Sequence, residues 1–152
     1  MKNTTLCYIE KDGAYLMMHR IKKKNDENHD KWIGIGGKFE EGESPFDCAR
    51  REIFEECGVN PKNLRYRGIV TFVSDEYGTE YMHLLTADGY EGEIDYNCDE
   101  GRLEWVKKEK IPTLPIWEGD KIFFRLLDSE ERFFSLKLQY KKEKLINSTL
   151  EV

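Results

Sequence analysis

The pattern of apolar and polar residues along the chain predicts strands interrupted by two helices. Short runs rich in β-branched and aromatic residues, separated by turn residues, are typical of strands. Such runs span residues 4–10, 14–20, 32–35, 65–74, 80–87, 103–107, 132–139 and 143–150. Asp12-Gly13 is a strong hairpin turn signal. Polar loops are expected at 22–31 and, with many acids, at 88–101. Because the strands alternate with separate helices, the pattern predicts an α/β fold with a mixed sheet packed between helices.

The first predicted helix spans residues 44–57 and carries both of its end signals. Ser44 suits the N-cap, Pro45 suits the first helical position, and Asp47 nearly completes a capping box. Gly58 suits the position that ends the helix. One stripe of this helix is apolar and is expected to be buried: Phe46, Ala49, Ile53 and Cys57. A second helix is predicted from about residue 119 to 128, with its own apolar stripe: Ile122, Phe123, Leu126 and Leu127.

Three carboxylates lie beside the apolar stripe of the first helix. Glu52, Glu55 and Glu56 recur at spacings of three and four residues, and like charges so placed repel by a few tenths of a kcal/mol per pair, roughly. A solvated helix face is the ordinary explanation of such a pattern. A cation between the carboxylates is favoured here because they border the buried stripe, Arg51 lies among them, and a Gly36-Gly37 turn precedes the helix. Oxygen ligands of this kind select Mg²⁺, for which Mn²⁺ can substitute, and these ions typically bridge carboxylates to phosphates.

Composition narrows the classes of function. The chain has 152 residues, 39% of them hydrophobic and 36% charged, as expected of one globular domain over residues 1–152. Its net charge of −6 argues against a nucleic acid polymer as partner. No apolar run is long enough to span a bilayer, and the N-terminal residues show no secretory signal, so a cytoplasmic location is expected. The cysteines match no zinc framework and are expected to stay reduced.

The segment around the first helix resembles the signature of the Nudix hydrolases, Gly-x5-Glu-x7-Arg-Glu-U-x-Glu-Glu-x-Gly-U, where U is a bulky aliphatic residue. Every fixed position matches: Gly37, Glu43, Arg51, Glu52, Ile53, Glu55, Glu56, Gly58 and Val59. The resemblance implies an α/β/α sandwich with a mixed central sheet. It also implies metal-dependent cleavage of a diphosphate that is linked to another group.

Carried over residue by residue, the resemblance assigns roles within the signature. It implies that Glu52, Glu55 and Glu56 bind metal together with the Gly37 carbonyl. Arg51 is implied to orient a catalytic glutamate, and Glu43 to support the loop, with a second metal as a further role. The general base varies within the family, so Glu55, Glu56 and a glutamate from a later loop all remain candidates. Glu100, in the acidic loop, is that later glutamate, and it resembles the acidic residue that completes the metal site in several members of the family; a solvated acidic loop is the alternative.

Two segments outside the signature are similar to the oxidised-purine triphosphatases of this family: residues 31–38, which include Trp32, and residues 115–120. Trp117 and Phe72 are then expected to sandwich a base, by stacking worth roughly 1–3 kcal/mol, and Asp120 to bond a purine edge. Lys38 and Lys23 are expected to meet phosphate oxygens. Core packing is the alternative for the two rings, and a favourable helix N-terminal charge is the alternative for Asp120.

The chain departs from that subgroup at two positions, which puts the preference for an oxidised base in doubt. Ile33 replaces an asparagine and cannot read a base edge, and Gly119 replaces the first of two aspartates. The leading hypothesis is hydrolysis of a nucleoside triphosphate, such as 8-oxo-dGTP, to monophosphate and pyrophosphate. A nucleoside diphosphate derivative as substrate and a non-catalytic nucleotide-binding module are the alternatives. The protein is expected to be a monomer or a homodimer.

Overall fold

Strands and helices follow one another almost as the hydrophobic pattern predicts. The structure, a computed structural model, describes residues 1–22 and 25–152. The strands are β1 (Lys2–Lys11), β2 (Ala14–His19), β3 (Trp32–Ile33), β4 (Asn60–Lys62), β5 (Arg65–Ser74), β6 (Gly78–Ala87), β7 (Gly89–Glu91), β8 (Arg102–Lys107), β9 (Phe134–Lys141) and β10 (Lys144–Glu151). The helices are α1 (Pro45–Cys57) and α2 (Asp120–Ser129), with a 3₁₀ helix, η1 (Lys108–Thr113), between β8 and α2.

The main sheet is mixed, as the sequence predicts. Its strands run in the order β10-β9-β5-β6-β1-β2-β3, and β8 also pairs with β2. β1 pairs with β6 in parallel, and β5 pairs with β9 in parallel, whereas the other pairs within this sheet are antiparallel. The parallel pairs join strands that are distant along the chain, so they bring the two ends of the sequence into one sheet.

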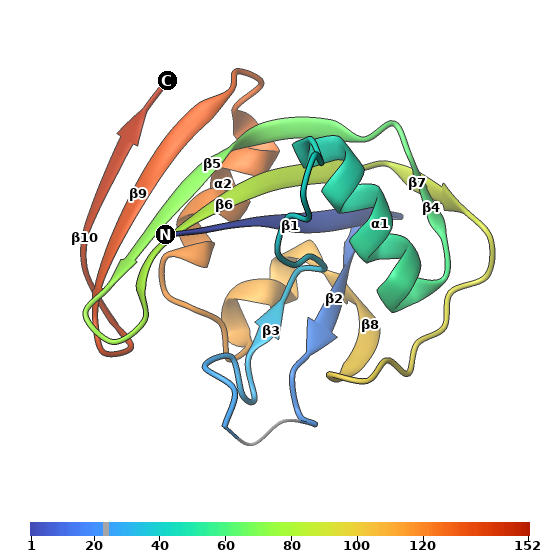
Figure 1. The fold of residues 1–152 in the computed structure, drawn as a ribbon, viewed down its shortest axis with the longest axis horizontal. Coiled ribbons are helices and arrows are strands. Elements are labelled where there is room, and N and C mark those ends of the chain that lie inside the picture. The colour runs from blue at the N-terminus through green and yellow to red at the C-terminus, as the bar shows by residue number, and fades with distance from the viewer. Residues whose placement is uncertain (23–24) are drawn as a thin grey trace.

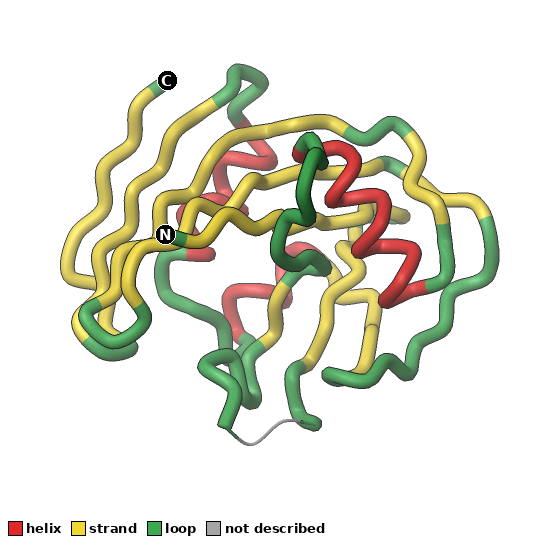
Figure 2. The backbone as a smooth tube through the Cα atoms, in the orientation of Figure 1, coloured by secondary structure: helices red, strands yellow, loops and turns green. Residues whose placement is uncertain are grey.

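The two helices cover opposite faces of this sheet (Figures 1 and 2). α1 packs against one core that includes Ile9, Leu16 and Ile53. α2 packs against the other core, which includes Tyr8 and Phe123. Successive residues of β1 and β2 point into alternate cores, which explains why both strands read as continuous apolar runs. The arrangement is the α/β/α sandwich that the signature implies.

Helix α1 begins and ends where its capping residues predict. The Ser44 hydroxyl accepts a hydrogen bond from the Asp47 amide at 3.1 Å, and the Asp47 carboxylate accepts one from the Ser44 amide at 3.1 Å. Gly58 adopts φ 78° at the C-terminal end, and its amide donates to the Phe54 carbonyl at 2.9 Å. Cys48, Ala49, Ile53 and Cys57 are buried, so the carboxylates of the next stripe are held at the edge of the core.

The differences from the predicted elements are short additions and shifted ends. β4 and β7 pair as a separate small ribbon, so part of the expected acidic loop is a strand. β3 ends at Ile33, two residues early, although Ile35 still pairs with Cys7 as an isolated bridge. The closing hairpin is present but begins later than its apolar pattern suggests. No helix among the described residues is long and apolar enough to cross a membrane.

Candidate active site

A cavity of about 550 Å³ lies between the loop after β3, the helix α1, the strand β5 and the start of α2. A volume of this size suits a small molecule such as a nucleotide. Many residues that the sequence singles out line it together: Gly36, Gly37, Lys38, Arg51, Glu52, Glu56, Phe72, Glu100, Trp117 and Asp120. The signature residues and the aromatic segments therefore meet at one site, although they lie far apart along the chain.

Three other expected site residues lie outside the cavity lining. Trp32 stacks on the ring of His19, with centroids 4.4 Å apart and planes at 5°. The Glu55 side chain is 56% exposed. Glu43 accepts hydrogen bonds from Arg51 and from the Glu40 amide, so its place agrees with a supporting role. Lys23 lies outside the described residues.

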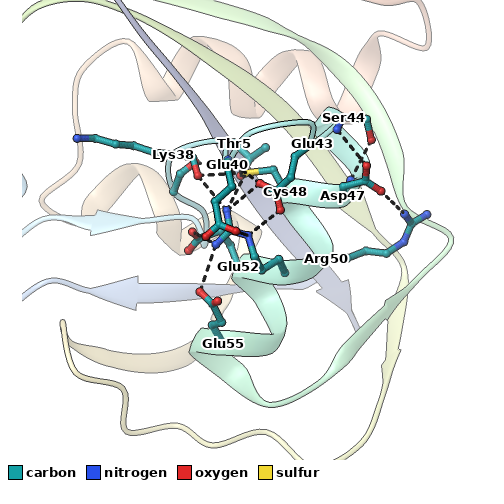
Figure 3. Close-up of polar contacts among 12 residues, drawn as sticks. Thr5, Lys38, Glu40, Glu43, Ser44, Asp47, Cys48, Arg50, Glu52 and Glu55 are labelled. Atoms are coloured by element: carbon teal, nitrogen blue, oxygen red, sulfur yellow. Dashed lines mark hydrogen bonds and ion pairs between the residues drawn. The ribbon is translucent and has the colours of Figure 1, made fainter.

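Arg51 is the centre of the polar network on α1. Figure 3 shows three of the residues that this network joins, Glu43, Glu52 and Glu55. The Nε and one terminal nitrogen of Arg51 donate to both carboxylate oxygens of Glu43, at 2.7 and 2.9 Å. Its other terminal nitrogen donates to Glu52 at 2.8 Å and to Glu55 at 3.3 Å. The same guanidinium also donates to the Lys38 carbonyl at 2.9 Å. These bonds lower the pKa of Glu43 to about 2 and tie the glycine loop to the helix.

The carboxylates that face the cavity repel one another. Burial, followed by the charges of Glu52 and Glu100, raises the pKa of Glu56 to about 8. Burial likewise raises the pKa of Glu52, with Glu55 and Glu100 adding to the shift and Arg51 opposing it. One oxygen of Glu56, Oε2, is buried and has no hydrogen-bond partner among the described groups. A buried carboxylate oxygen without a donor, surrounded by other carboxylates, fits a divalent cation.

These carboxylates do not form a finished cation cage. Within residues 1–22 and 25–152, no three acidic, histidine or cysteine side chains converge closely enough to hold a metal ion. Arginines hold the acids instead, because Arg51 bonds Glu52 and Arg20 bonds Glu100 at 3.1 Å. The residue types nevertheless fit a hard cation.

Arg20 is a site residue that sequence reasoning missed. Its Nε donates to Asp26 at 2.7 Å, and both side chains are largely buried. Because Arg20 also bonds Glu100, one guanidinium joins β2, the loop before β3 and the acidic loop before β8. The sequence signal for Arg20 is its position directly after an apolar strand, which by itself indicates only where that strand ends.

The two glycines before α1 let the loop lie close to the backbone of β1 and to the carboxylate of Glu52. A Cβ atom on Gly36 would overlap the carbonyl oxygen of Thr5, and one on Gly37 would lie 2.5 Å from Glu52 Oε1. The Gly37 carbonyl accepts a hydrogen bond from the Thr5 amide at 2.9 Å. Since a carbonyl oxygen has a second lone pair, this bond leaves the oxygen able to meet a cation.

The aromatic end of the cavity differs from the expected sandwich. Phe72 and Trp117 meet edge to face, with ring centroids 5.2 Å apart and planes at 83°. A base cannot lie between two rings that already touch, so the expectation of a sandwich is wrong in this geometry. Both residues also belong to the core under α2 and are less than a tenth exposed. The two rings therefore pack in the core and also form part of the cavity wall.

Asp120 lies at the start of α2, with its side chain in the cavity wall and 6% exposed. Burial raises its pKa to about 8, against a smaller opposing effect of Lys31. The protonated acid both donates and accepts a hydrogen bond, whereas a carboxylate only accepts. Because burial disfavours the charged form of Asp120, it works against the alternative of a charge that favours the helix dipole. Gly119, which precedes it, lies so close to β9 that a Cβ would come within 2.5 Å of Leu138.

Polar residues from the N-terminal strand and the loop before β3 complete this end of the cavity. Thr4 donates to Glu80 at 2.7 Å, and Lys2 lies 3.7 Å from Glu80 and 3.8 Å from Glu27. Asn28 accepts a hydrogen bond from the Trp117 indole nitrogen at 2.7 Å. Sequence reasoning missed all of these residues, because nothing in their local pattern marks them.

Comparison with known proteins agrees with this geometry. The family model of the NUDIX domain matches residues 2–127, which contain the whole cavity lining. The chain belongs to the Nudix family. It is accordingly a hydrolase of nucleoside diphosphate-linked substrates, a pyrophosphohydrolase. Nudix hydrolases generally use divalent metal ions, which agrees with the donor set around Glu56.

Relatives of this Nudix chain include enzymes that act on nucleotides. It is 36% identical over 135 residues to an oxidized purine nucleoside triphosphate hydrolase of Danio rerio, covering 87% of this chain and 83% of that one. The enzyme of the same name from Mus musculus is 32% identical, over 73% of this chain and 71% of its own. Among solved structures, the Mutator MutT protein of Bacillus halodurans superposes with a TM-score of 0.87 at 28% identity, covering 99% of this chain and 98% of that one.

Proposed function

We propose that this Nudix hydrolase is a Mg²⁺-dependent pyrophosphohydrolase of nucleoside triphosphates, including an oxidised purine nucleotide such as 8-oxo-dGTP. The products are a nucleoside monophosphate and pyrophosphate. The observation that carries the proposal is the single cavity that joins the carboxylates of α1 to the aromatic end at Trp117 and Asp120. The names of the curated relatives from Danio rerio and Mus musculus support this substrate class.

At the acidic end, Glu52, Glu56, Glu100 and the Gly37 carbonyl would hold the ion. Mg²⁺, for which Mn²⁺ can substitute, neutralises phosphate charge and makes a water molecule a better nucleophile. Arg51 holds Glu52 and the loop with Lys38 in place, so these groups meet the phosphates without reorganising the helix. Lys38 lines the same end and supplies a positive charge to the phosphates.

The identity of the general base is narrowed by position. Glu56 and Glu100 line the cavity, whereas Glu55 is more than half exposed and points toward Arg51. A base must reach the proton that it removes. We therefore infer that Glu56 or Glu100 takes the proton of the attacking water, and that Glu55 keeps the orientation of Arg51.

At the other end, the planar base would lie against the edges of Trp117 and Phe72 and meet Asp120. A protonated Asp120 can donate to a carbonyl or ring nitrogen of a purine and accept from an adjacent N–H. The replacement of asparagine by Ile33 leaves an apolar wall at this place. This wall is the reason to test canonical and oxidised bases side by side.

The experiment is a panel of canonical and oxidised nucleoside triphosphates and nucleoside diphosphate derivatives, assayed with Mg²⁺ and with Mn²⁺, with the products identified. We expect monophosphate and pyrophosphate from a triphosphate. Two monophosphate species from ADP-ribose or a dinucleotide, with no triphosphate cleaved, would replace the proposal by a diphosphate-linked substrate. Tight nucleotide binding without hydrolysis at millimolar metal concentration would instead indicate a binding module.

A further inference from the structure

Asn28 lines the cavity beside Trp117, on the loop before β3. Its side-chain oxygen, Oδ1, lies 2.7 Å from the indole nitrogen of Trp117. An indole N–H can only donate a hydrogen bond, so the oxygen of the Asn28 amide faces the ring. The amide nitrogen, with its two N–H donors, therefore faces away from Trp117.

The loop holds Asn28 in this position through its backbone. The backbone N–H of Asn28 donates to Asp26 Oδ1 at 3.2 Å, and the backbone carbonyl of Asn28 accepts from the backbone N–H of Lys31 at 2.9 Å. Asp26 in turn accepts a hydrogen bond from the largely buried Arg20. The side chain is thus fixed from both ends, and a group that is fixed before binding loses little entropy on meeting a ligand.

The other polar groups at this end of the cavity are engaged or do not discriminate. The carboxylates of Glu27 and Glu80 face Lys2, and Glu80 also accepts from Thr4. The acid of Asp120 can both donate and accept, so it tolerates either kind of base edge. Among the described residues, none accepts a hydrogen bond from the Asn28 amide nitrogen. That nitrogen is consequently the dedicated donor at the base end.

We propose that Asn28 is a specificity-determining residue, whose amide nitrogen donates to a carbonyl oxygen of the base and so favours 6-oxopurines over 6-aminopurines. This inference rests on the proposed function, since it places a nucleobase at the Trp117 end of the cavity. A guanine-type base offers a carbonyl oxygen to the donor, whereas adenine offers an amino group, and two donors facing each other leave both unpaired. An unpaired buried polar group weakens binding substantially.

The direct test is Asn28→Asp, which keeps an oxygen for the Trp117 indole and removes the donor. Asn25→Asp, an exposed change on the same loop, is the control for the added negative charge. The ratio of kcat/KM for dGTP to that for dATP is measured with Mg²⁺, and the binding of GMP and AMP without metal is measured by calorimetry. We expect the wild type and the control to prefer the guanine nucleotide, and Asn28→Asp to lower that preference at least about tenfold.

Trp117→Phe provides a second variant, because it removes the indole donor that orients the amide while keeping an aromatic ring. We expect a smaller loss of preference than in Asn28→Asp. Thermal melting followed by circular dichroism checks that each variant is folded.

The two kinds of measurement separate this inference from the proposed function. If triphosphates are not hydrolysed but GMP still binds more tightly than AMP in an Asn28-dependent way, the proposed function fails and the inference stands. If triphosphates are hydrolysed and Asn28→Asp leaves the base preference unchanged, the inference is overturned and the function stands. A wild type with no preference between the two bases, or no binding of either monophosphate, also overturns the inference.

Discussion

At the scale of single residues, the acids of the site differ in what surrounds them. Glu43 has a pKa of about 2 because Arg51 donates hydrogen bonds to both of its carboxylate oxygens. Glu56 and Asp120 each have a pKa of about 8, chiefly because they are buried. Hydrogen bonds from Arg51 therefore favour the charged form of Glu43, whereas burial opposes the charged form of Glu56 and Asp120.

We predict that Glu56→Gln lowers kcat/KM by at least about 10²-fold, the usual size of a lost acid–base or ligand group. The fold should be unaffected at pH 7, because glutamine has the shape of the protonated acid that the metal-free protein holds there. Steady-state kinetics with Mg²⁺ and thermal melting are the measurements. Glu41→Gln, an exposed acid on the loop before α1, is the control for loss of a carboxylate. Near wild-type turnover in Glu56→Gln would show that Glu56 is neither a metal ligand nor the general base.

Asp120 predicts a pH dependence of stability with a defined sign. Its pKa in the folded protein, about 8, lies above the ordinary value of 3.8, so the folded state keeps a proton that the unfolded state has lost. Stability is therefore highest below pH 4 as far as this group is concerned, falls as the pH rises to 8, and is level above. Asp120→Asn should make the slope shallower by up to about 1.4 kcal/mol per pH unit.

Urea unfolding of the metal-free protein at several pH values between 5 and 8 measures this slope. Glu56 contributes a slope of the same sign, so the comparison is between the wild type and Asp120→Asn, not between the variant and zero. Parallel curves for the two proteins would mean that Asp120 is ionised in the folded state.

At the scale of elements, the glycine loop, β1 and α1 act as one unit. Gly36 lies against the Thr5 carbonyl of β1, and Gly37 lies against Glu52 of α1. Arg51 completes the unit by bonding the Lys38 carbonyl. The spacing of the signature is thus the length of chain needed to turn from the sheet edge into a helix whose third turn faces that same edge.

We predict that Gly36→Ala lowers the free energy of unfolding by about 1–3 kcal/mol, as expected when an added methyl group forces backbone apart. It should also reduce kcat/KM at least tenfold, because the loop that positions Lys38 and Gly37 must move. Gly42→Ala is the control, since Gly42 has φ 79° but open space around it. Its cost should be about 1 kcal/mol, with activity retained. Urea unfolding and kinetics of both variants test the difference.

At the scale of the whole molecule, the sheet separates two cores, and each supports one end of the cavity. Ile53 lies in the core under α1, next to Glu52 and the acidic end. Phe123 lies in the core under α2, one turn after Asp120 and the aromatic end. Both side chains are fully buried. The acidic end and the aromatic end of the cavity are therefore supported by cores on different sides of the sheet.

We predict that Ile53→Ala and Phe123→Ala each lower the free energy of unfolding by about 2–5 kcal/mol. Their functional effects should differ, however. Ile53→Ala should raise the Mg²⁺ concentration needed for half-maximal activity, and Phe123→Ala should raise KM for the nucleotide. Metal titrations and substrate saturation curves of the two variants check this. Identical effects of both substitutions on both quantities would show that the two ends are not separable.

Local patterns predicted most of the elements, because strands and helices depend on periodicity and end signals within a few residues. The caps of α1 at Ser44 and Gly58 are examples. The short ribbon of β4 and β7 could not be predicted, because a strand of three residues is too short to show an alternation of apolar and polar positions. The residues of the signature were recognisable for the same reason, since helical spacing alone puts Glu52 and Glu56 on one stripe.

What only the tertiary structure decided are the contacts between distant segments. Arg20 bonds Glu100 across 80 positions, and Trp117 bonds Asn28 across 89. The perpendicular rings of Phe72 and Trp117 and the burial of Asp120 likewise depend on how α2 packs on the sheet. Sequence by itself determined the family and the class of hydrolase, because the signature lies in one capped helix and its loop. The shape of the base pocket came only with the fold, because its walls are assembled from segments that meet only when the sheet forms.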